Sequence, residues 1–288
     1  IEKSYKNFDS KEVVNIKKVG NINLLELYNG PTLAFKDIAM QVIGNMYDVF
    51  QAADEKKVNV VVATSGDTGS AAIAALNHKK NINLFVLHPY NKISNIQRKI
   101  MTTIDSNNVF NLAIKGTFDD CQKIVKEMFS ENKFREKINM SGVNSINWAR
   151  IVCQIVYYFY TVLKFHNKKL NFSVPTGNFG DIYAGYIAKK MGLPIEKLIV
   201  ATNENDILKR VINSGEYKPS FVKPSLSPSM DIQVSSNFER LLYDIVDQDD
   251  KKVSTLMAKL QSNGSFKLDK EEVKKIKKDF SAEKVSDK

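Results

Sequence analysis

The sequence predicts an α/β protein with mostly parallel sheets flanked by helices. Short apolar runs alternate with longer amphipathic stretches along most of the 288 residues, which is typical of βαβ units. The runs at residues 58–63 and 84–88 are almost continuously apolar, as expected of strands buried on both faces of a parallel sheet. The length is enough for two domains of ordinary size or for one large domain.

Hydrophobic periodicity places the elements one after another. Residues 24–28 and 58–63 predict strands, and residues 33–50 between them predict a helix. Later helices are expected at residues 69–76, 93–104, 119–129, 147–165 and 181–191, and later strands at residues 84–88, 109–114, 172–174 and 198–201. From Asp269 onward a charged segment predicts a solvated amphipathic helix, with Val273 and Ile276 facing inward.

Composition excludes several classes of protein. Hydrophobic residues make up 43% and charged residues 26% of the chain, which excludes disordered, collagen-like and disulfide-scaffold proteins. The longest apolar stretch, residues 151–165, is interrupted by Gln154 and Lys164 and is shorter than the roughly 20 residues that span a bilayer. No signal pattern begins the chain, and Cys121 and Cys153 lack the spacing of a metal site. We therefore expect a cytoplasmic protein with no metal and no membrane partner.

The net charge of +10 raises the question of nucleic-acid binding. The basic residues are nearly all lysines, and they are spread in pairs along the chain. No zinc-finger spacing, arginine-rich segment or aromatic RNA-binding motif accompanies them. The charge is better interpreted as a lysine-rich solvated surface, so no nucleic-acid partner is expected.

The first junction that can carry chemistry connects the strand at 58–63 to the next helix. Gly66 lets the backbone approach a ligand closely, and free N–H groups at a helix start attract an anion. The hydroxyls of Ser65 and Thr68 add donors, so a carboxylate or a phosphate is the expected ligand. Asp67 can only accept hydrogen bonds when ionised, so it should not face that anion. The alternative is a helix cap with helix-breaking glycines and no ligand.

A second junction of the same kind follows the strand at 172–174. Gly177 and Gly180 bracket a turn before a helix, and Thr176 and Asn178 supply side-chain donors. Backbone N–H groups in such a turn can cradle a phosphate. The turn matches neither a P-loop nor the dinucleotide fingerprint, so the motif alone leaves a purely structural turn open.

A lysine near a helix start is the third feature. Thr32 predicts an N-cap, which places Lys36 in the first turns of the helix at 33–50, among Leu33, Ala34 and Phe35. Apolar neighbours and the positive helix start both disfavour an ammonium ion and favour a nucleophilic amine. Such an amine can form a Schiff base. The alternative is an ordinary surface lysine.

Together these segments resemble those of the threonine synthases, which are fold-type II pyridoxal phosphate (PLP) enzymes. The resemblance extends from about Leu24 to Leu241 and keeps the order of the motifs, at residues 30–37, 63–72, 144–150, 174–181, 201–203, 226–232 and 235–240. It implies a two-domain, tryptophan synthase β-like fold. In that fold residues 1–40 and 150–288 would form the large PLP-binding domain, and residues 41–149 a smaller, mobile substrate-binding domain.

The resemblance also implies the role of each site residue. Lys36 resembles the lysine that binds PLP covalently and later moves protons. The other residues that resemble functional ones are the PLP-phosphate loop Gly177, Asn178, Phe179, Gly180 and Asp181, the substrate-carboxylate loop Ser65, Gly66, Asp67 and Thr68, and the substrate-phosphate segment Asn144, Ser145, Asn147 and Arg150. The planar donor fork of an arginine suits phosphate oxygens, which supports the last role independently. The alternative for that segment is a helix start capped by Asn144 or Ser145, with Arg150 solvated.

The activity that the resemblance implies is conversion of O-phospho-L-homoserine and water to L-threonine and phosphate, by a monomer or a homodimer. A PLP-dependent phospho-lyase, a serine/threonine dehydratase and a non-catalytic threonine-synthase-like protein remain alternatives. Members of this family usually carry a longer segment before Leu24 and continue beyond the charged helix. We therefore expect that the chain is clipped at both ends, and no residue is assigned to the pyridine nitrogen of PLP.

Overall fold

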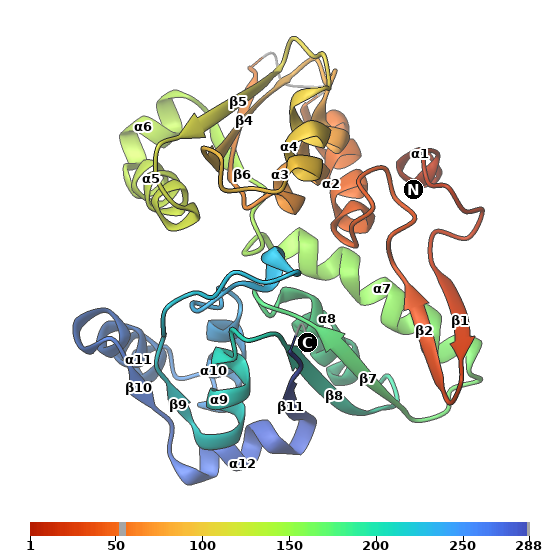
Figure 1. Cartoon of the computed structure of the whole chain (residues 1–288), viewed down its shortest axis with the longest axis vertical. Coiled ribbons are helices and arrows are strands. Elements are labelled where there is room, and N and C mark those ends of the chain that lie inside the picture. Colours follow the sequence, from red (N-terminus) through yellow and green to blue (C-terminus); the bar gives the residue numbers. More distant parts are fainter. Residues whose placement is uncertain (52–55, 287–288) are drawn as a thin grey trace. The chain divides into compact units, whose positions relative to one another are not determined.

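A computed structural model describes residues 1–51 and 56–286 of the chain. The residues group into two compact units, Ile1–Cys153 and Gln154–Lys288, called here the N-terminal and C-terminal units (Figure 1). The boundary falls inside helix α7 (Trp148–Lys164). The expected grouping of residues 1–40 with residues 150–288 stays a prediction.

The N-terminal unit is built on a four-stranded parallel sheet with the order β5-β4-β3-β6. These strands are β3 (Val58–Ala63), β4 (Ile82–Pro89), β5 (Val109–Ile114) and β6 (Met140–Gly142). Val60 and Val62 of the central strand β3 are fully buried and Val61 is 2% exposed, so both faces of this strand are covered. The apolar run at 58–63 therefore predicted the strand with its bounds, because such a run has no solvent side.

Helices cover the two faces of this sheet. On one face Val60, Val62 and Val86 share a core with α2 (Lys36–Gln51), α3 (Asp67–Leu76) and α4 (Asn95–Thr102). On the other face Val61 and Leu87 pack against α5 (Phe118–Ser130), which is followed by α6 (Asn132–Lys137). Thus α3 and α4 begin at the carboxyl ends of the strands, where open α/β sheets place their ligands.

An antiparallel hairpin precedes the sheet. After α1 (Glu2–Tyr5), strand β1 (Asn15–Val19) pairs with β2 (Ile22–Glu26), and Gly20 has a positive φ of 57° in the two-residue turn. The strand expected at 24–28 therefore begins two residues earlier. The reason is the turn, which sets the pairing of Val19 with Ile22 and hence the register of the whole hairpin.

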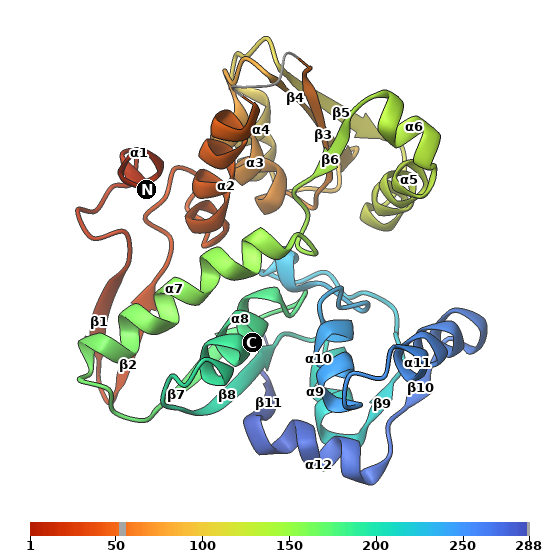
Figure 2. The same ribbon diagram turned by 180° about the vertical axis from the view of Figure 1, so that it is seen from behind.

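The C-terminal unit has a three-stranded parallel sheet with the order β11-β8-β7 (Figure 2). Its strands are β7 (Leu170–Pro175), β8 (Ile195–Thr202) and β11 (Phe280–Lys284). The remaining elements are α8 (Gly180–Lys190), α9 (Ile207–Ser214), the paired strands β9 (Glu216–Tyr217) and β10 (Phe266–Lys267), a short 3₁₀ turn (Pro228–Met230), α10 (Phe238–Ile245), α11 (Asp250–Asn263) and α12 (Lys270–Asp279).

The charged segment near the end of the chain is only partly the expected solvated helix. Helix α12 forms, with Ile276 buried and Val273 half-buried as predicted. The chain then continues as β11, in which Phe280 is 1% exposed and pairs with Leu198 of β8. Ser281, Glu283 and Lys284 hide this strand in the sequence, because only Phe280 and Ala282, which are buried, are apolar.

Across residues 1–51 and 56–286, no helix is long and apolar enough to cross a membrane.

Candidate functional site

Lys36 is the first residue of α2, three residues after the expected helix start. Leu33 has a positive φ of 57°, so the chain still turns at this point. Thr32 is not the N-cap that the sequence predicted. Its backbone N–H and its hydroxyl instead donate to the two carboxylate oxygens of Asp37, at 2.8 and 2.7 Å. Burial raises the pKa of the Asp37 carboxyl, and the hydrogen bonds from Thr32 oppose that shift.

The amine of Lys36 is held inside the N-terminal unit. Lys36 is 9% exposed, so it is not an ordinary surface lysine. Its Nζ lies 3.0 Å from Oδ2 of Asp67 and 4.5 Å above the centre of the Phe35 ring. The apolar surroundings expected from the sequence are therefore only half of the environment, since a carboxylate completes it.

The loop at residues 65–68, expected to bind the substrate carboxylate, is held by Thr64, which precedes it. Oγ1 of Thr64 accepts hydrogen bonds from the N–H groups of Gly66, at 2.9 Å, and Gly69, at 2.8 Å. Thr64 thus satisfies two of the N–H groups near the helix start, where the sequence predicted free amides that attract an anion. Neither Ser65 nor Thr68 hydrogen-bonds through its hydroxyl to any residue in the described ranges, so these two hydroxyls remain as donors for a ligand.

Gly66 meets a requirement that no other residue type meets here. Its φ of 137° lies in a region that side-chain-bearing residues rarely adopt. A Cβ at this position would also lie 2.3 Å from the side chain of Gln97. The glycine is thus needed for the loop to pass close to α4.

Gln97 is a site residue that the sequence analysis missed. Its Nε2 donates a short hydrogen bond to Oδ1 of Asp67, whose other oxygen holds Lys36. Ser94 caps α4 by accepting from the Gln97 N–H at 3.1 Å, and it donates to the Gln97 side chain at 3.0 Å. The pattern Ser-x-x-Gln is a capping-box signature and could have placed Gln97 at a helix start. Only the tertiary structure shows that it contacts Asp67.

The segment 144–150 lies beside the same loop. Asn144 donates from Nδ2 to the carbonyl of Ala63, at 2.9 Å, which ties the segment to the end of β3. Ser145 is in the following turn, closed by a hydrogen bond from the Asn147 N–H to the Asn144 carbonyl. Oδ1 of Asn147 accepts from the Ala149 N–H at 3.0 Å, so Asn147 caps α7 in place of Asn144 or Ser145.

Arg150 is buried at 3% exposure. The alternative of a solvated arginine is therefore wrong. Its Nη1 is 3.4 Å from the carbonyl of Val143, the residue that directly follows β6. A buried guanidinium is expensive to desolvate, which favours a role in holding an anion.

The second junction lies in the C-terminal unit, between β7 and α8. Phe179 is the N-cap of α8, has a positive φ of 66° and is completely buried. Its ring centre is 5.5 Å from those of Phe238 and Phe280. A Cβ on Gly177 would lie 2.9 Å from Ile232 and 3.1 Å from the backbone of Met230. The turn is thus packed tightly against residues 230–232.

Consecutive backbone N–H groups of this turn lie at the start of α8. The N–H groups of residues 177–180, called here the amide cup, donate to no acceptor in the part of the chain that the structure describes. They open the 11-residue helix α8, whose positive end adds to their attraction for an anion. The cup is therefore suited to a phosphate such as that of PLP.

The Asp181 side chain hydrogen-bonds to the residues on either side of the cup. Its Oδ1 accepts hydrogen bonds from the Thr176 hydroxyl and from the Ile182 N–H, the latter at 2.8 Å. Its carboxylate is thereby held next to the strand end and the helix backbone. The sequence analysis placed Asp181 among the PLP-binding residues, and its bonding pattern favours a support role for that loop.

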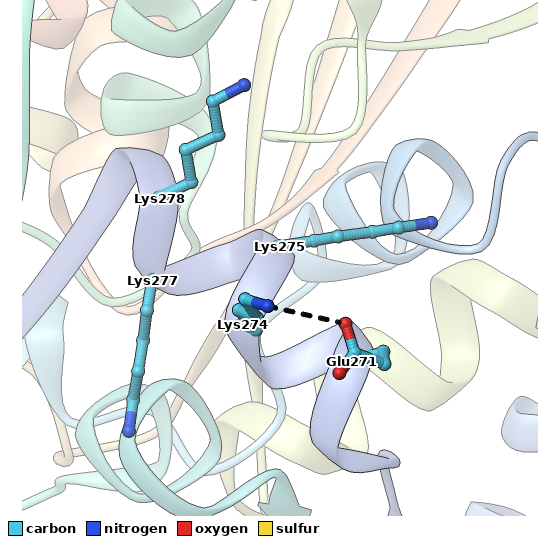
Figure 3. A pocket seen from close by; sticks show the side chains of 5 residues that line it. All are labelled: Glu271, Lys274, Lys275, Lys277 and Lys278. Carbon is cyan, nitrogen blue, oxygen red and sulfur yellow. Dashed lines mark ion pairs between the residues drawn. The ribbon is translucent and has the colours of Figure 1, made fainter.

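A surface pocket on α12 contains none of these residues. It is lined by Glu271, Lys274, Lys275, Lys277 and Lys278 (Figure 3). Three of the lysines already have partners, since Lys274 pairs with Glu271, Lys275 with Asp247, and Lys277 donates to a backbone carbonyl. We assign it no role. Within residues 1–51 and 56–286, no group of His, Cys, Asp or Glu could hold a metal ion.

Comparison with known proteins identifies the family of the chain. The family model "Pyridoxal-phosphate dependent enzyme" matches residues 17–259. The chain is 48% identical to threonine synthase of Saccharomyces cerevisiae, over 99% of the chain and 61% of that protein. It is 47% identical to threonine synthase of Pseudomonas aeruginosa, over 100% of the chain and 62% of that protein.

Solved structures give the same result. The PLP-bound threonine synthase from Brucella melitensis is 46% identical and superposes with a TM-score of 0.92, covering 99% of this chain and 62% of that one. The yeast threonine synthase is 47% identical with a TM-score of 0.88, covering 99% and 61%. The chain thus spans 61–62% of the length of these relatives. With its buried lysine and its amide cup, the chain belongs to the pyridoxal-phosphate dependent enzyme family.

Proposed function

We propose that this chain forms part of a threonine synthase, which converts O-phospho-L-homoserine and water to L-threonine and phosphate. The observation that carries the proposal is the presence of two separate structures suited to a phosphate. One is the amide cup, and the other is the segment 144–150 with its buried Arg150. This reaction requires two phosphates to be bound at once, one on the cofactor and one on the substrate. A serine/threonine dehydratase needs only the first.

The amide cup and Lys36 are the residues that would hold PLP. The cup supplies backbone N–H donors at a helix start for the cofactor phosphate. Lys36 supplies a buried primary amine for the covalent link. When bound, PLP supplies an electron sink for carbanion chemistry at the substrate.

Lys36 also moves protons in this proposal. As a free amine, its Nζ takes a proton from Cα of the substrate and delivers or removes protons at Cβ, as a general acid and base. Asp67 lies 3.0 Å from Nζ and can accept a hydrogen bond from it between these transfers. It thereby keeps the amine oriented when no substrate atom is in reach.

The substrate is recognised by two groups of side chains in the N-terminal unit. The hydroxyls of Ser65 and Thr68 bind its carboxylate, because they are side-chain donors of this loop that hydrogen-bond to no residue in the described ranges. Arg150 binds its phosphate through its planar fork of N–H donors. Asn144 and Asn147 use their side-chain amides on backbone carbonyls, so we assign them to shaping the segment.

The test is product analysis with the full-length protein, PLP and O-phospho-L-homoserine. We expect threonine and phosphate to appear in equal amounts. Phosphate with a keto acid and ammonia would identify a phospho-lyase instead. Bound PLP without any product would identify a non-catalytic relative.

A further inference from the structure

The sequence motif at residues 235–240 has no role in the function proposed above, yet it contacts the amide cup directly. Asn237, at the start of α10, is completely buried. Its backbone N–H and its side-chain Nδ2 both donate to the carbonyl oxygen of Asn178, each at 3.1 Å. One residue thus holds one carbonyl with two hydrogen bonds.

These two bonds set the direction of a cup amide. The peptide between Asn178 and Phe179 is trans, since the described chain has no cis peptide bond. In a trans peptide the C=O and the N–H point in opposite directions. Because the Asn178 carbonyl points toward Asn237, the Phe179 N–H must point away from Asn237. That is the side on which a phosphate would be bound.

The neighbours of Asn237 support the same arrangement. Nε of Arg240 donates to Oδ1 of Asn237 at 3.1 Å, which turns the Nδ2 side of the amide toward the Asn178 carbonyl. Phe238 packs edge-on against Phe179, with ring centres 5.5 Å apart. Phe179 has a left-handed backbone, which is unfavourable for a residue with a side chain and persists only when its surroundings enforce it.

The neighbouring motif at residues 226–232 packs against Gly177 of the cup. Ile232 and Met230 leave no room for a Cβ on Gly177. Asp231 between them accepts hydrogen bonds from Asn203, at 2.8 Å, and Asn205, at 3.0 Å. The segment is therefore fixed to the sheet end independently of the cup. It can impose a shape on the cup rather than follow it.

We propose that Asn237 is a positioning residue, which fixes the amide cup in the conformation that binds the phosphate of the cofactor. The inference rests on the proposed role of the cup. Asn237 acts through the Asn178–Phe179 peptide, because its amide group is already bonded to that peptide and to Arg240. Loss of Asn237 should therefore weaken the binding of the phosphate group and leave the binding of the rest of the cofactor intact.

The experiment compares PLP with pyridoxal, which lacks the phosphate. Dissociation constants of both are measured by absorbance titration of the full chain, for the wild type, Asn237→Ala and Arg240→Ala. Asn237→Ala should weaken PLP binding about tenfold or more, as expected for the loss of a buried hydrogen bond, with pyridoxal binding nearly unchanged. Arg240 is half-buried, so its replacement endangers folding less and should give the same selective loss at a smaller size.

Asn108→Ala is the matched control. Asn108 is a buried asparagine of the N-terminal unit that likewise donates to backbone carbonyls, those of Leu76 and Ile82, both at 2.9 Å. Its loss should lower thermal stability and keep the ratio of PLP to pyridoxal affinity. An unchanged ratio in Asn237→Ala and Arg240→Ala would overturn the role of Asn237 and leave the cup standing. A wild type that binds PLP and pyridoxal equally would overturn both the role of the cup and the role of Asn237. A fall of the affinity ratio in Asn108→Ala as large as in Asn237→Ala would overturn the role of Asn237.

Discussion

The loops that follow β3 and β7 begin alike and end differently. Each opens with a threonine whose N–H donates to the neighbouring strand, Thr64 to Leu87 at 2.9 Å and Thr176 to Ala201 at 3.1 Å. Oγ1 of Thr64 then accepts from two amides of its own loop. The hydroxyl of Thr176 instead donates to Asp181, and the amides of residues 177–180 have no acceptor in the described ranges.

In the proposed function, this difference separates two kinds of anion site. In the loop after β3, the threonine satisfies the amides of both glycines, and the hydroxyls of Ser65 and Thr68 can form and break contacts with a ligand that arrives and leaves. Where the amides are unused, the ligand receives fixed backbone dipoles at a helix start, which suits a group that stays bound. A glycine-rich turn after a strand can therefore bind an anion through its backbone only where its N–H groups have no partner in the protein.

The largest effect should come from the lysine that the first loop holds. Lys36→Ala should lower turnover roughly 10³-fold, because the general acid and base is lost. Borohydride reduction of the PLP-loaded protein followed by peptide mapping should find the label on Lys36. Lys79→Ala is the control, since Lys79 is also an ion-paired lysine of the N-terminal unit, with a side chain 15% exposed against 11% for Lys36. A label on any other lysine contradicts the assignment.

The next effect separates the two phosphates. Arg150→Ala should keep the absorbance of bound PLP and lower turnover of O-phospho-L-homoserine by roughly 30-fold or more, for the loss of about 2–3 kcal/mol of charge-assisted hydrogen bonding. Arg150→Lys should recover only part of the activity, because an ammonium lacks the planar fork. Loss of PLP with normal turnover per bound cofactor would show that the two phosphate sites are assigned in reverse.

A smaller effect is expected from filling the space behind the cup. Gly177→Val should weaken PLP binding roughly 5- to 150-fold, since overpacking against Ile232 and the Met230 backbone costs about 1–3 kcal/mol. The control is Gly192→Ala, where an added Cβ meets nothing within 4 Å. That variant should lose some stability, because its φ is 98°, and keep its affinity for PLP. Normal PLP affinity in Gly177→Val would mean that the turn is purely structural.

The sequence predicted these loops well and their bonding poorly. The strands at 58–63 and 109–114 were predicted with their bounds, because local hydrophobicity decides where a buried strand lies. Strand β11 was missed, since its pairing with β8 comes from a distant part of the chain. The sites followed the same rule. Thr32 was predicted to be a helix cap, but it donates hydrogen bonds to Asp37 instead. Gln97 contacts Asp67 only because the tertiary structure brings α4 next to the loop.

The smallest effects test the comparison itself, by removing one hydroxyl from each loop. Thr64→Val leaves the Gly66 and Gly69 amides without an acceptor and should lower the free energy of unfolding by about 1–3 kcal/mol. Because the loop that carries Ser65 and Thr68 is then less well held, KM for the substrate should rise by a few-fold while PLP affinity stays the same. Thr176→Val should instead lower the affinity for PLP and leave KM for the substrate unchanged.

In Thr176→Val the Asp181 carboxylate loses its hydroxyl donor and keeps the bond from the Ile182 N–H. It can then turn toward the cup, where its charge repels the cofactor phosphate. We expect PLP affinity to fall a few-fold, while KM of the PLP-loaded enzyme for the substrate stays unchanged. Stability is followed by urea unfolding, PLP affinity by absorbance titration and KM by phosphate release. If both variants shift the same parameter, the two threonines do not divide the anion sites between them, and the difference in their hydrogen bonds has no functional consequence.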